Sequence, residues 1–180
     1  YRLKENQPCI YIMNHQSNYD VLLGSLVNVN NTVAIGKREI LYFPFFGQFF
    51  WLSGNILIKR KKHAKAMKAM RKVIKIIKDR NLSILIMPEG TRSKGKGLLR
   101  FKRGAFHTAI EAGVPIVPIC ASSWHKFINL KKWKSGKVYL NVLPPISTSG
   151  LTKRDAGTLA EQCQQLMGTE IERLNCNFDT

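Results

Sequence analysis

Short apolar runs alternate with longer amphipathic stretches along this chain of 180 residues. Polar residues, glycine or proline flank most of the apolar runs, a pattern typical of buried strands. The pattern predicts strands at Cys9–Met13, Thr32–Ile35, Asn55–Ile58, Ser83–Met87, Ile116–Cys120 and Val138–Leu143.

The stretches between the strands predict helices. We expect them at roughly Asn18–Val27, His63–Lys78, Arg103–Ala112 and Lys153–Leu174. Gly113 is placed to cap the third helix, and Thr152 is placed to start the fourth. Alternation of strands and helices is typical of α/β domains. We therefore expect a single domain over residues 1–180, with a central mixed, largely parallel β-sheet flanked by helices.

The longest apolar region is Leu41 to Ile58, but Pro44, Gly47 and Gly54 are among the residues that interrupt it. A helix that spans a membrane is therefore not expected here, and a hydrophobic surface or the wall of a lipid-sized groove fits better. The chain has no initiating Met and no signal peptide, and it opens almost at once on a predicted strand. We therefore expect that an N-terminal part is missing.

The net charge is +18, from 29 Lys and Arg against 11 Asp and Glu. This excess indicates a polyanionic partner, which is nucleic acid, an anionic membrane or a phosphorylated substrate. The region Lys59–Arg80 holds 11 of the basic residues. This region suits anionic lipid headgroups, with an attraction of about 1 kcal/mol per basic residue near the surface. A solvated helix face is the alternative.

The four cysteines show no CxxC spacing, so we expect reduced thiols and no zinc site.

A histidine and an aspartate lie five residues apart in the segment 14–20, directly after the first predicted strand. A histidine held by a carboxylate can take a proton from a hydroxyl. Five helical residues turn two side chains about 140° apart, so His15 and Asp20 can meet only if His15 lies in a turn before the helix. Asn14 and Ser17 are placed to brace that turn. The alternative is that Asp20 only caps a helix, because Ser17-x-x-Asp20 also fits a capping box.

A second motif, Glu89-Gly90-Thr91-Arg92, follows the fourth predicted strand. Gly90 permits a tight turn, and the guanidinium of Arg92 suits phosphate oxygens. Glu89 is placed to pair with Arg92 or with a substrate hydroxyl, and Thr91 has a hydroxyl to donate. A surface turn with a local salt bridge is the alternative.

Two further basic residues follow predicted strands. Arg60 ends the segment 54–60 and is a candidate second phosphate ligand, while Lys37 offers a point charge. Solvated charges are the alternative for both.

His63, His107 and His125 have no partners at metal spacing. There is no GxSxG elbow, P-loop or zinc pattern, so a serine mechanism, an ATPase and a metallohydrolase have no support.

The order of these segments resembles the glycerolipid acyltransferase family, which includes 1-acylglycerol-3-phosphate acyltransferases. Four blocks match in order: NHxxxxD at Asn14–Asp20, a GxIxIxR-like block at Gly54–Arg60, EGTR at Glu89–Arg92, and a proline-flanked apolar block at Val114–Ile119. An FKxG element follows the third block, at Phe101–Gly104. The chain departs from the family pattern in two ways. Lys59 stands where an aspartate is common, and the chain lacks the N-terminal membrane segment that members usually carry.

The resemblance implies an O-acyltransferase catalytic domain over residues 1–180. His15 would be the general base and Asp20 its partner, with Arg92, Arg60 and Lys37 on the substrate phosphate. Glu89, Gly90, Thr91 and Asn14 would position the substrate. The product would be phosphatidic acid, made from a lysophospholipid and acyl-CoA or acyl-carrier protein, with no metal or other cofactor.

The implied location is the cytoplasmic face of an anionic inner or plasma membrane, and no nucleic acid is expected. Two alternatives stay open. One is an acyltransferase or transacylase for another lysophospholipid. The other is a basic module that binds nucleic acid or another polyanion.

Overall fold

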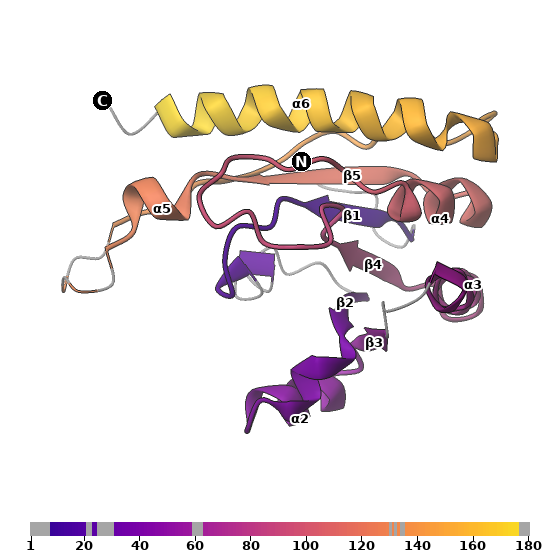
Figure 1. Cartoon of the computed structure of the whole chain (residues 1–180). Helices are drawn as coiled ribbons and strands as arrows, with labels where there is room; N and C mark the ends of the chain where they lie inside the picture. The colour runs from indigo at the N-terminus through magenta and orange to yellow at the C-terminus, as the bar shows by residue number, and fades with distance from the viewer. Residues whose placement is uncertain are drawn as a thin grey trace.

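A six-stranded sheet forms the centre of the protein in its computed structural model (Figure 1). The structure describes residues 8–20, 23–24, 31–58, 63–129, 131, 133 and 136–176, with the backbone alone for 63–69. The strands follow the order β3-β2-β4-β1-β5-β6 across the sheet. Their bounds are β1 Ile10–Met13, β2 Thr32–Lys37, β3 Ile56–Ile58, β4 Ser83–Ile86, β5 Ile116–Ala121 and β6 Leu140–Val142.

Every strand pair is parallel except β5–β6, where the last strand runs antiparallel. In register, Ile10 of β1 lies between Ile84 of β4 and Ile116 of β5. Each residue of β1, β4 and β5 is buried, as expected of central strands in a sheet covered on both faces. The predicted α/β fold with a mixed, largely parallel sheet is confirmed.

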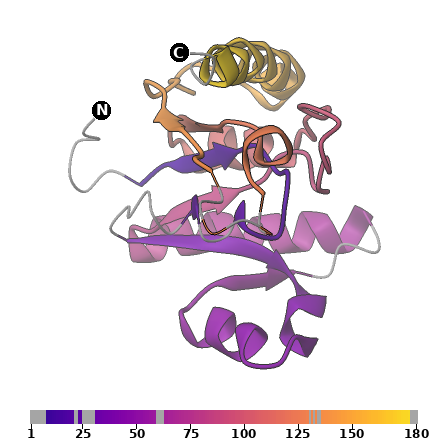
Figure 2. The same ribbon diagram turned by 90° about the vertical axis from the view of Figure 1, so that its left-hand side faces the viewer.

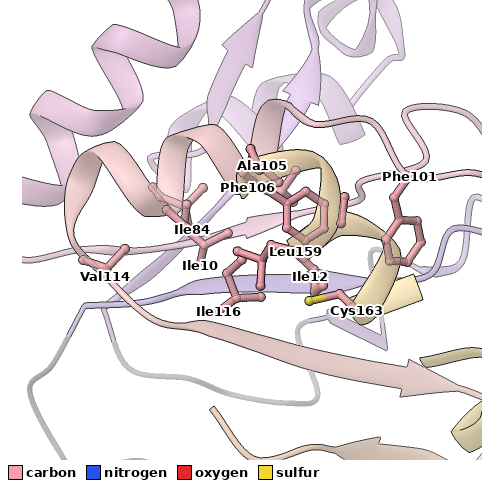
Figure 3. Packing of buried hydrophobic residues seen from close by; sticks show 14 of the residues in the cluster. Ile10, Ile12, Ile84, Phe101, Ala105, Phe106, Val114, Ile116, Leu159 and Cys163 are labelled. Atoms are coloured by element: carbon pink, nitrogen blue, oxygen red, sulfur yellow. The ribbon is translucent and has the colours of Figure 1, made fainter. Parts of the chain in front are cut away.

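Helices α3 (His63–Arg80), α4 (Gly104–Ala112) and α6 (Ala156–Cys176) contribute to the core on one face of the sheet. Ile10 and Ile12 pack there with Phe106 of α4 and Leu159 of α6 (Figure 3). Because strand side chains alternate between faces, Tyr11 belongs to a second cluster on the other face. β1, which leads into the first motif, is therefore anchored in both halves of the core.

The predicted helix boundaries near Gly113 and Thr152 are confirmed. Gly113 ends α4 in the left-handed region, at φ 71°, where glycine carries no Cβ penalty. Thr152 and Asp155 form a capping box around the short 3₁₀ turn η2 (Lys153–Asp155) that leads into α6. The backbone groups at both helix ends are thus satisfied locally.

Three short helical elements were not predicted: η1 (Arg38–Tyr42), α2 (Phe46–Leu52) and α5 (Trp124–Phe127). A run of apolar residues interrupted by Pro44 and Gly47 has no clear helical period, which is why the sequence pattern did not reveal α2. β2 also continues to Lys37, beyond the predicted end at Ile35. The predicted first helix, Asn18–Val27, is described only in part; Asp20, Leu23 and Gly24 are helical, and residues 21–22 and 25–27 lie outside the described part.

α6 and the η1–α2 segment lie at opposite ends of the molecule in two perpendicular views (Figures 1 and 2).

All four cysteines are free; Cys9, Cys120 and Cys163 are buried, and Cys176 is exposed. Burial raises the pKa of the Cys120 and Cys163 thiols to about 12. In the described part of the chain, no helix is both long enough and apolar enough to cross a bilayer.

Candidate active site

The two sequence motifs lie side by side because β1 and β4 are parallel neighbours in the sheet. β1 ends at Met13 and leads into His15, while β4 ends at Ile86 and leads into Glu89. In α/β sheets, ligand sites gather beyond the carboxyl ends of the strands. The fold therefore brings together residues 74 positions apart in the sequence.

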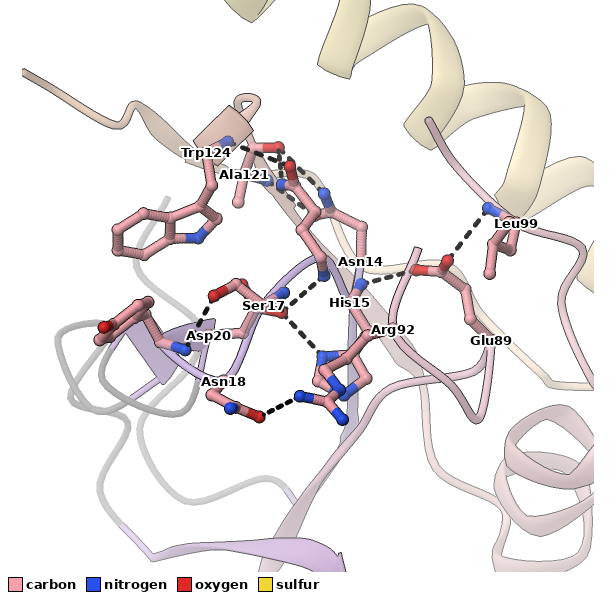
Figure 4. Close-up of polar contacts among 12 residues, drawn as sticks. Asn14, His15, Ser17, Asn18, Asp20, Glu89, Arg92, Leu99, Ala121 and Trp124 are labelled. Carbon is pink, nitrogen blue, oxygen red and sulfur yellow. Dashed lines mark hydrogen bonds and ion pairs between the residues drawn. The ribbon is translucent and has the colours of Figure 1, made fainter. Parts of the chain in front are cut away.

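His15 and Asp20 form the contact that their spacing predicted (Figure 4). The Oδ2 atom of Asp20 lies 2.7 Å from Nδ1 of His15. The same oxygen accepts the backbone N–H groups of Gln16 at 2.6 Å and Ser17 at 2.8 Å. Asp20 is fully buried, whereas the His15 side chain is 20% exposed. Nδ1 is the proton donor to the carboxylate in the neutral ring, which leaves the lone pair on Nε2.

The two alternatives for Asp20 are thus both realised by one oxygen atom. The bond from the Ser17 N–H is the carboxylate half of a capping box, and the bond to His15 orients the imidazole. His15 lies in the turn, and Asp20 opens the helical segment. This local geometry explains how five residues of spacing bring the two side chains together.

Glu89 holds the backbone of the first motif. It is only 2% exposed; Oε1 accepts the His15 N–H at 2.6 Å, and Oε2 accepts the Leu99 N–H at 3.0 Å. Burial raises the pKa of the Glu89 carboxyl, and the two N–H donors oppose that shift. Of the two roles considered for Glu89, the pairing with Arg92 is not formed, because the buried carboxylate accepts backbone N–H groups instead. Arg92 instead donates to Oδ1 of Asn18 at 2.6 Å.

The loop after Glu89 also binds the first motif directly. Gly90 has φ 70°, a value that favours glycine and permits the tight turn. Beyond the turn, the Ser93 N–H donates to the His15 carbonyl at 2.8 Å. Both backbone groups of His15 are therefore paired with the 89–93 segment, which fixes the position of the imidazole.

Asn14 and Gln16 tie the same turn to β5 on the other side. Asn14 exchanges two hydrogen bonds with the backbone of Ala121, at 3.0 Å and 2.9 Å. Gln16 donates to the Ser122 carbonyl at 2.9 Å and accepts the Trp124 N–H at 3.1 Å. Asn14 braces the turn as predicted, and both polar atoms of its side chain are engaged in these contacts.

A solvent-open hollow of about 380 Å³ lies beside the residues that follow His15. Its lining combines hydrogen-bonding groups with basic side chains: Gln16, Ser17, Asn18, Tyr19, Arg92, Lys94 and His125. Lys94, two residues beyond Arg92, was not predicted as a site residue. Neither was His125, and nothing near that residue in the sequence indicates such a role.

The remaining predicted phosphate ligands are placed only in part. Lys37 is exposed at the carboxyl end of β2, the neighbour of β4, so it lies at the same edge of the sheet. Arg60 lies outside the described residues. Thr91 is exposed next to Arg92.

The model of the family described as Acyltransferase matches residues 1–122, so the chain belongs to the Acyltransferase family. The resemblance predicted from the four blocks is thereby confirmed.

Named relatives refine this assignment. The chain is 45% identical over 172 residues to the 1-acyl-sn-glycerol-3-phosphate acyltransferase of Haemophilus influenzae, covering 96% of this chain and 72% of the relative. It is 46% identical over 166 residues to the Escherichia coli protein of the same name, covering 92% and 68%.

A solved structure supports the fold. The crystal structure of the 1-acyl-sn-glycerophosphate acyltransferase PlsC from Thermotoga maritima matches with a TM-score of 0.72 at 23% identity, over 95% of this chain and 68% of that one.

Proposed function

We propose that this chain transfers a fatty acyl group from acyl-CoA or acyl-carrier protein to the free hydroxyl of 1-acylglycerol-3-phosphate, giving phosphatidic acid. The contact of 2.7 Å between His15 Nδ1 and Asp20 Oδ2 carries the proposal, because it leaves Nε2 basic and directed away from the carboxylate. The relatives with the same name at 45% and 46% identity support the choice of acceptor.

His15 acts as the general base in this scheme. Nε2 takes the proton from the acceptor hydroxyl as its oxygen attacks the carbonyl carbon of the thioester. Asp20 stabilises the imidazolium that forms, since its oxygen lies against Nδ1–H. As the tetrahedral intermediate collapses, the carbon–sulfur bond breaks, and Nε2–H returns its proton to the leaving thiolate. No covalent enzyme intermediate, metal or other cofactor takes part.

Arg92 binds the phosphate of the acceptor. Its guanidinium is exposed beside the hollow and is held there by Asn18. Lys37 and Arg60 are proposed as further phosphate ligands. Thr91 and Gly90 position the glycerol part, while Asn14 and Glu89 act by fixing the turn that carries His15.

The protein works at an anionic membrane surface, on the cytoplasmic face of the inner or plasma membrane, with no nucleic-acid partner. Exposed basic residues of α3 support this location: Arg71, Lys72, Lys75 and Lys78. On its other side α3 buries Val73 and Ile77 in the core, so the charges stay available for lipid headgroups.

The test is thiol release from acyl-CoA with 1-acylglycerol-3-phosphate in detergent micelles. We expect His15→Ala to lower turnover by about 10²–10⁴-fold. His107→Ala is the matched control, because His107 lies on α4, away from the turn, and should leave turnover unchanged. A folded His15→Ala variant with full activity would contradict the proposal. If the unaltered protein releases no thiol from acyl-CoA, acyl-carrier protein is tested as the donor. A panel of lysophospholipids tests the choice of acceptor.

A further inference from the structure

The η1–α2 segment displays an aromatic surface that the proposed chemistry does not use. Seven of the eleven large hydrophobic side chains exposed in the described part of the chain belong to it: Tyr42, Phe43, Phe45, Phe46, Phe49, Trp51 and Leu52. Phe45 is 90% exposed and Leu52 is 75% exposed. We call residues 38–52 the aromatic protrusion. It extends from the end of the molecule opposite α6 (Figures 1 and 2).

Specific contacts fix the shape of the aromatic protrusion. Phe50 is 4% exposed and packs where a Cβ on Gly36 of β2 would collide with its ring. Gly47 lets α2 approach η1 so closely that an added Cβ would collide with the Ile40 carbonyl oxygen. Asn55 accepts the Ala34 N–H at 2.7 Å and donates to the Phe50 carbonyl at 3.0 Å. The segment that carries the exposed rings is therefore held in place by these contacts with the rest of the fold.

Two of the outward side chains share one face of the helix. Phe49 and Leu52 are spaced at i and i+3, which places them on the same side of α2, and Phe45 precedes the helix as its N-cap. Phe45 also lies at the tip of a γ-turn, with φ 61° and a hydrogen bond of 2.6 Å from the Phe46 N–H to the Pro44 carbonyl. Bulky residues rarely adopt positive φ, so the backbone bears strain to hold this ring outward.

The chemistry of the surface matches an anionic bilayer. Contiguous apolar patches on protein surfaces mark interaction sites, and Trp and Tyr are enriched where membranes meet water. Basic residues flank the patch: Lys37 and Arg38 precede it, against the single acid Glu39. In the sequence, Lys59-Arg60-Lys61-Lys62 follow β3 directly. Aromatic rings that are next to positive charge in the sequence are complementary to acyl chains below anionic headgroups.

We propose that the aromatic protrusion inserts into the interfacial layer of an anionic phospholipid bilayer and docks the protein there. This deepens the function proposed above, on which it rests, by naming the element that contacts the membrane. η1 begins directly after the carboxyl end of β2, at the sheet edge that carries His15. Docking through this segment brings the edge with the active site to the surface from which a lysophospholipid is drawn.

Tryptophan fluorescence tests the insertion without any need for acyl transfer. Trp124→Phe and Trp133→Phe leave Trp51 as the sole tryptophan of the chain. With phosphatidylcholine vesicles that contain phosphatidylglycerol, we expect a blue shift of Trp51 emission and quenching by brominated lipids. Phosphatidylcholine alone should give a weaker shift. Vesicle binding without any change in Trp51 emission overturns the proposal.

Substitutions measure the contribution of the outward face. In the otherwise unaltered chain, Phe45→Ser and Phe49→Ser should each lower vesicle partitioning by about tenfold, because each removes a ring from apolar surroundings. Leu166→Ser is the matched control; Leu166 is 45% exposed on α6 and should leave partitioning unchanged. Equal binding by all three variants overturns the proposal. The proposal is also overturned if sedimentation velocity shows a dimer that Phe49→Ser dissociates, because a second copy of the chain would then cover the patch.

A water-soluble acceptor separates this proposal from the proposed function. With short-chain 1-acylglycerol-3-phosphate below its micelle concentration, Phe45→Ser and Phe49→Ser should keep the thiol release of the unaltered protein. Loss of release in these variants, at unchanged stability, overturns the docking role. If the unaltered protein binds vesicles through Trp51 but transfers no acyl group from either donor, the proposed function fails and the membrane contact stands.

Discussion

Replacement of Glu89 by glutamine separates a role in holding the active-site turn from a role on the substrate. Both carboxylate oxygens accept backbone N–H groups, from His15 at 2.6 Å and from Leu99 at 3.0 Å. Glutamine keeps the size of the side chain but offers one acceptor oxygen and an NH₂ group. In either orientation of the amide, one of the two backbone N–H groups faces another donor.

The expected cost follows from these contacts. Loss of one charge-assisted hydrogen bond inside the protein, with a backbone N–H left unpaired, lowers the free energy of unfolding by about 2–4 kcal/mol. A domain has about 5–15 kcal/mol in all, so Glu89→Gln should still fold. We also expect kcat to fall, since misplacement of a reacting group by about 1 Å costs about 10²-fold. The KM for the acceptor should change little.

Urea unfolding and thiol release together check this expectation. Glu111→Gln is the matched control, because Glu111 pairs with Lys153 across 3.1 Å on the surface, and such pairs contribute less than about 1 kcal/mol. A Glu89→Gln variant as stable as the unaltered protein, with a raised KM for the acceptor, would refute the reasoning. It would favour the sequence-based hypothesis that Glu89 contacts a substrate hydroxyl.

Three further substitutions test the turn and the fold. Asp20→Asn removes the charge beside the imidazole, and we expect kcat for thiol release to fall by about 10²–10⁴-fold at nearly constant acceptor KM; unchanged kcat contradicts the pairing. Gln16→Ala removes the bond from the Trp124 N–H and should lower the urea-measured stability by about 1–3 kcal/mol; full stability contradicts the brace. Hydrogen bonds from Thr152 hold the pKa of Asp155 below its usual 3.8. The stabilisation by the Asp155 carboxylate is therefore present above pH 3.8 and disappears as the pH falls through the lower pKa of the folded state. The Tm values of Asp155→Asn and the unaltered protein should therefore converge in strong acid. A difference in Tm that stays constant with pH contradicts this role of Asp155.

The strands and the His15–Asp20 contact could be predicted because their causes are local. A buried strand needs only a short apolar run, and five residues of spacing across a turn decide whether His15 meets Asp20. Gly113 and Thr152 mark helix ends through their own backbone and side-chain preferences. In each case the information lies within a few neighbouring residues.

The orientation of Glu89 and Arg92 could not be predicted, because it depends on strand order. Glu89 binds the His15 N–H and Arg92 binds Asn18 across 74 residues of sequence. These contacts exist only once β4 lies next to β1. The same holds for His125, which reaches the hollow through the position of α5 beyond β5. α2 escaped prediction for another reason, since apolar residues on its exposed face conceal the usual amphipathic period.

The central place of β1 sets the order of events during synthesis. β1 is the first strand of the described chain, yet both of its neighbours come late: Ile10 pairs with Ile84 and with Ile116. At about 5–20 residues per second, the ribosome needs roughly 4–15 s to complete the interval from β1 to β4. During that time an apolar strand is without either partner, and distant parallel pairing is slow in itself. The nascent chain thus presents a target for chaperones well before the turn that carries His15 can gain its contacts with Glu89 and Ala121.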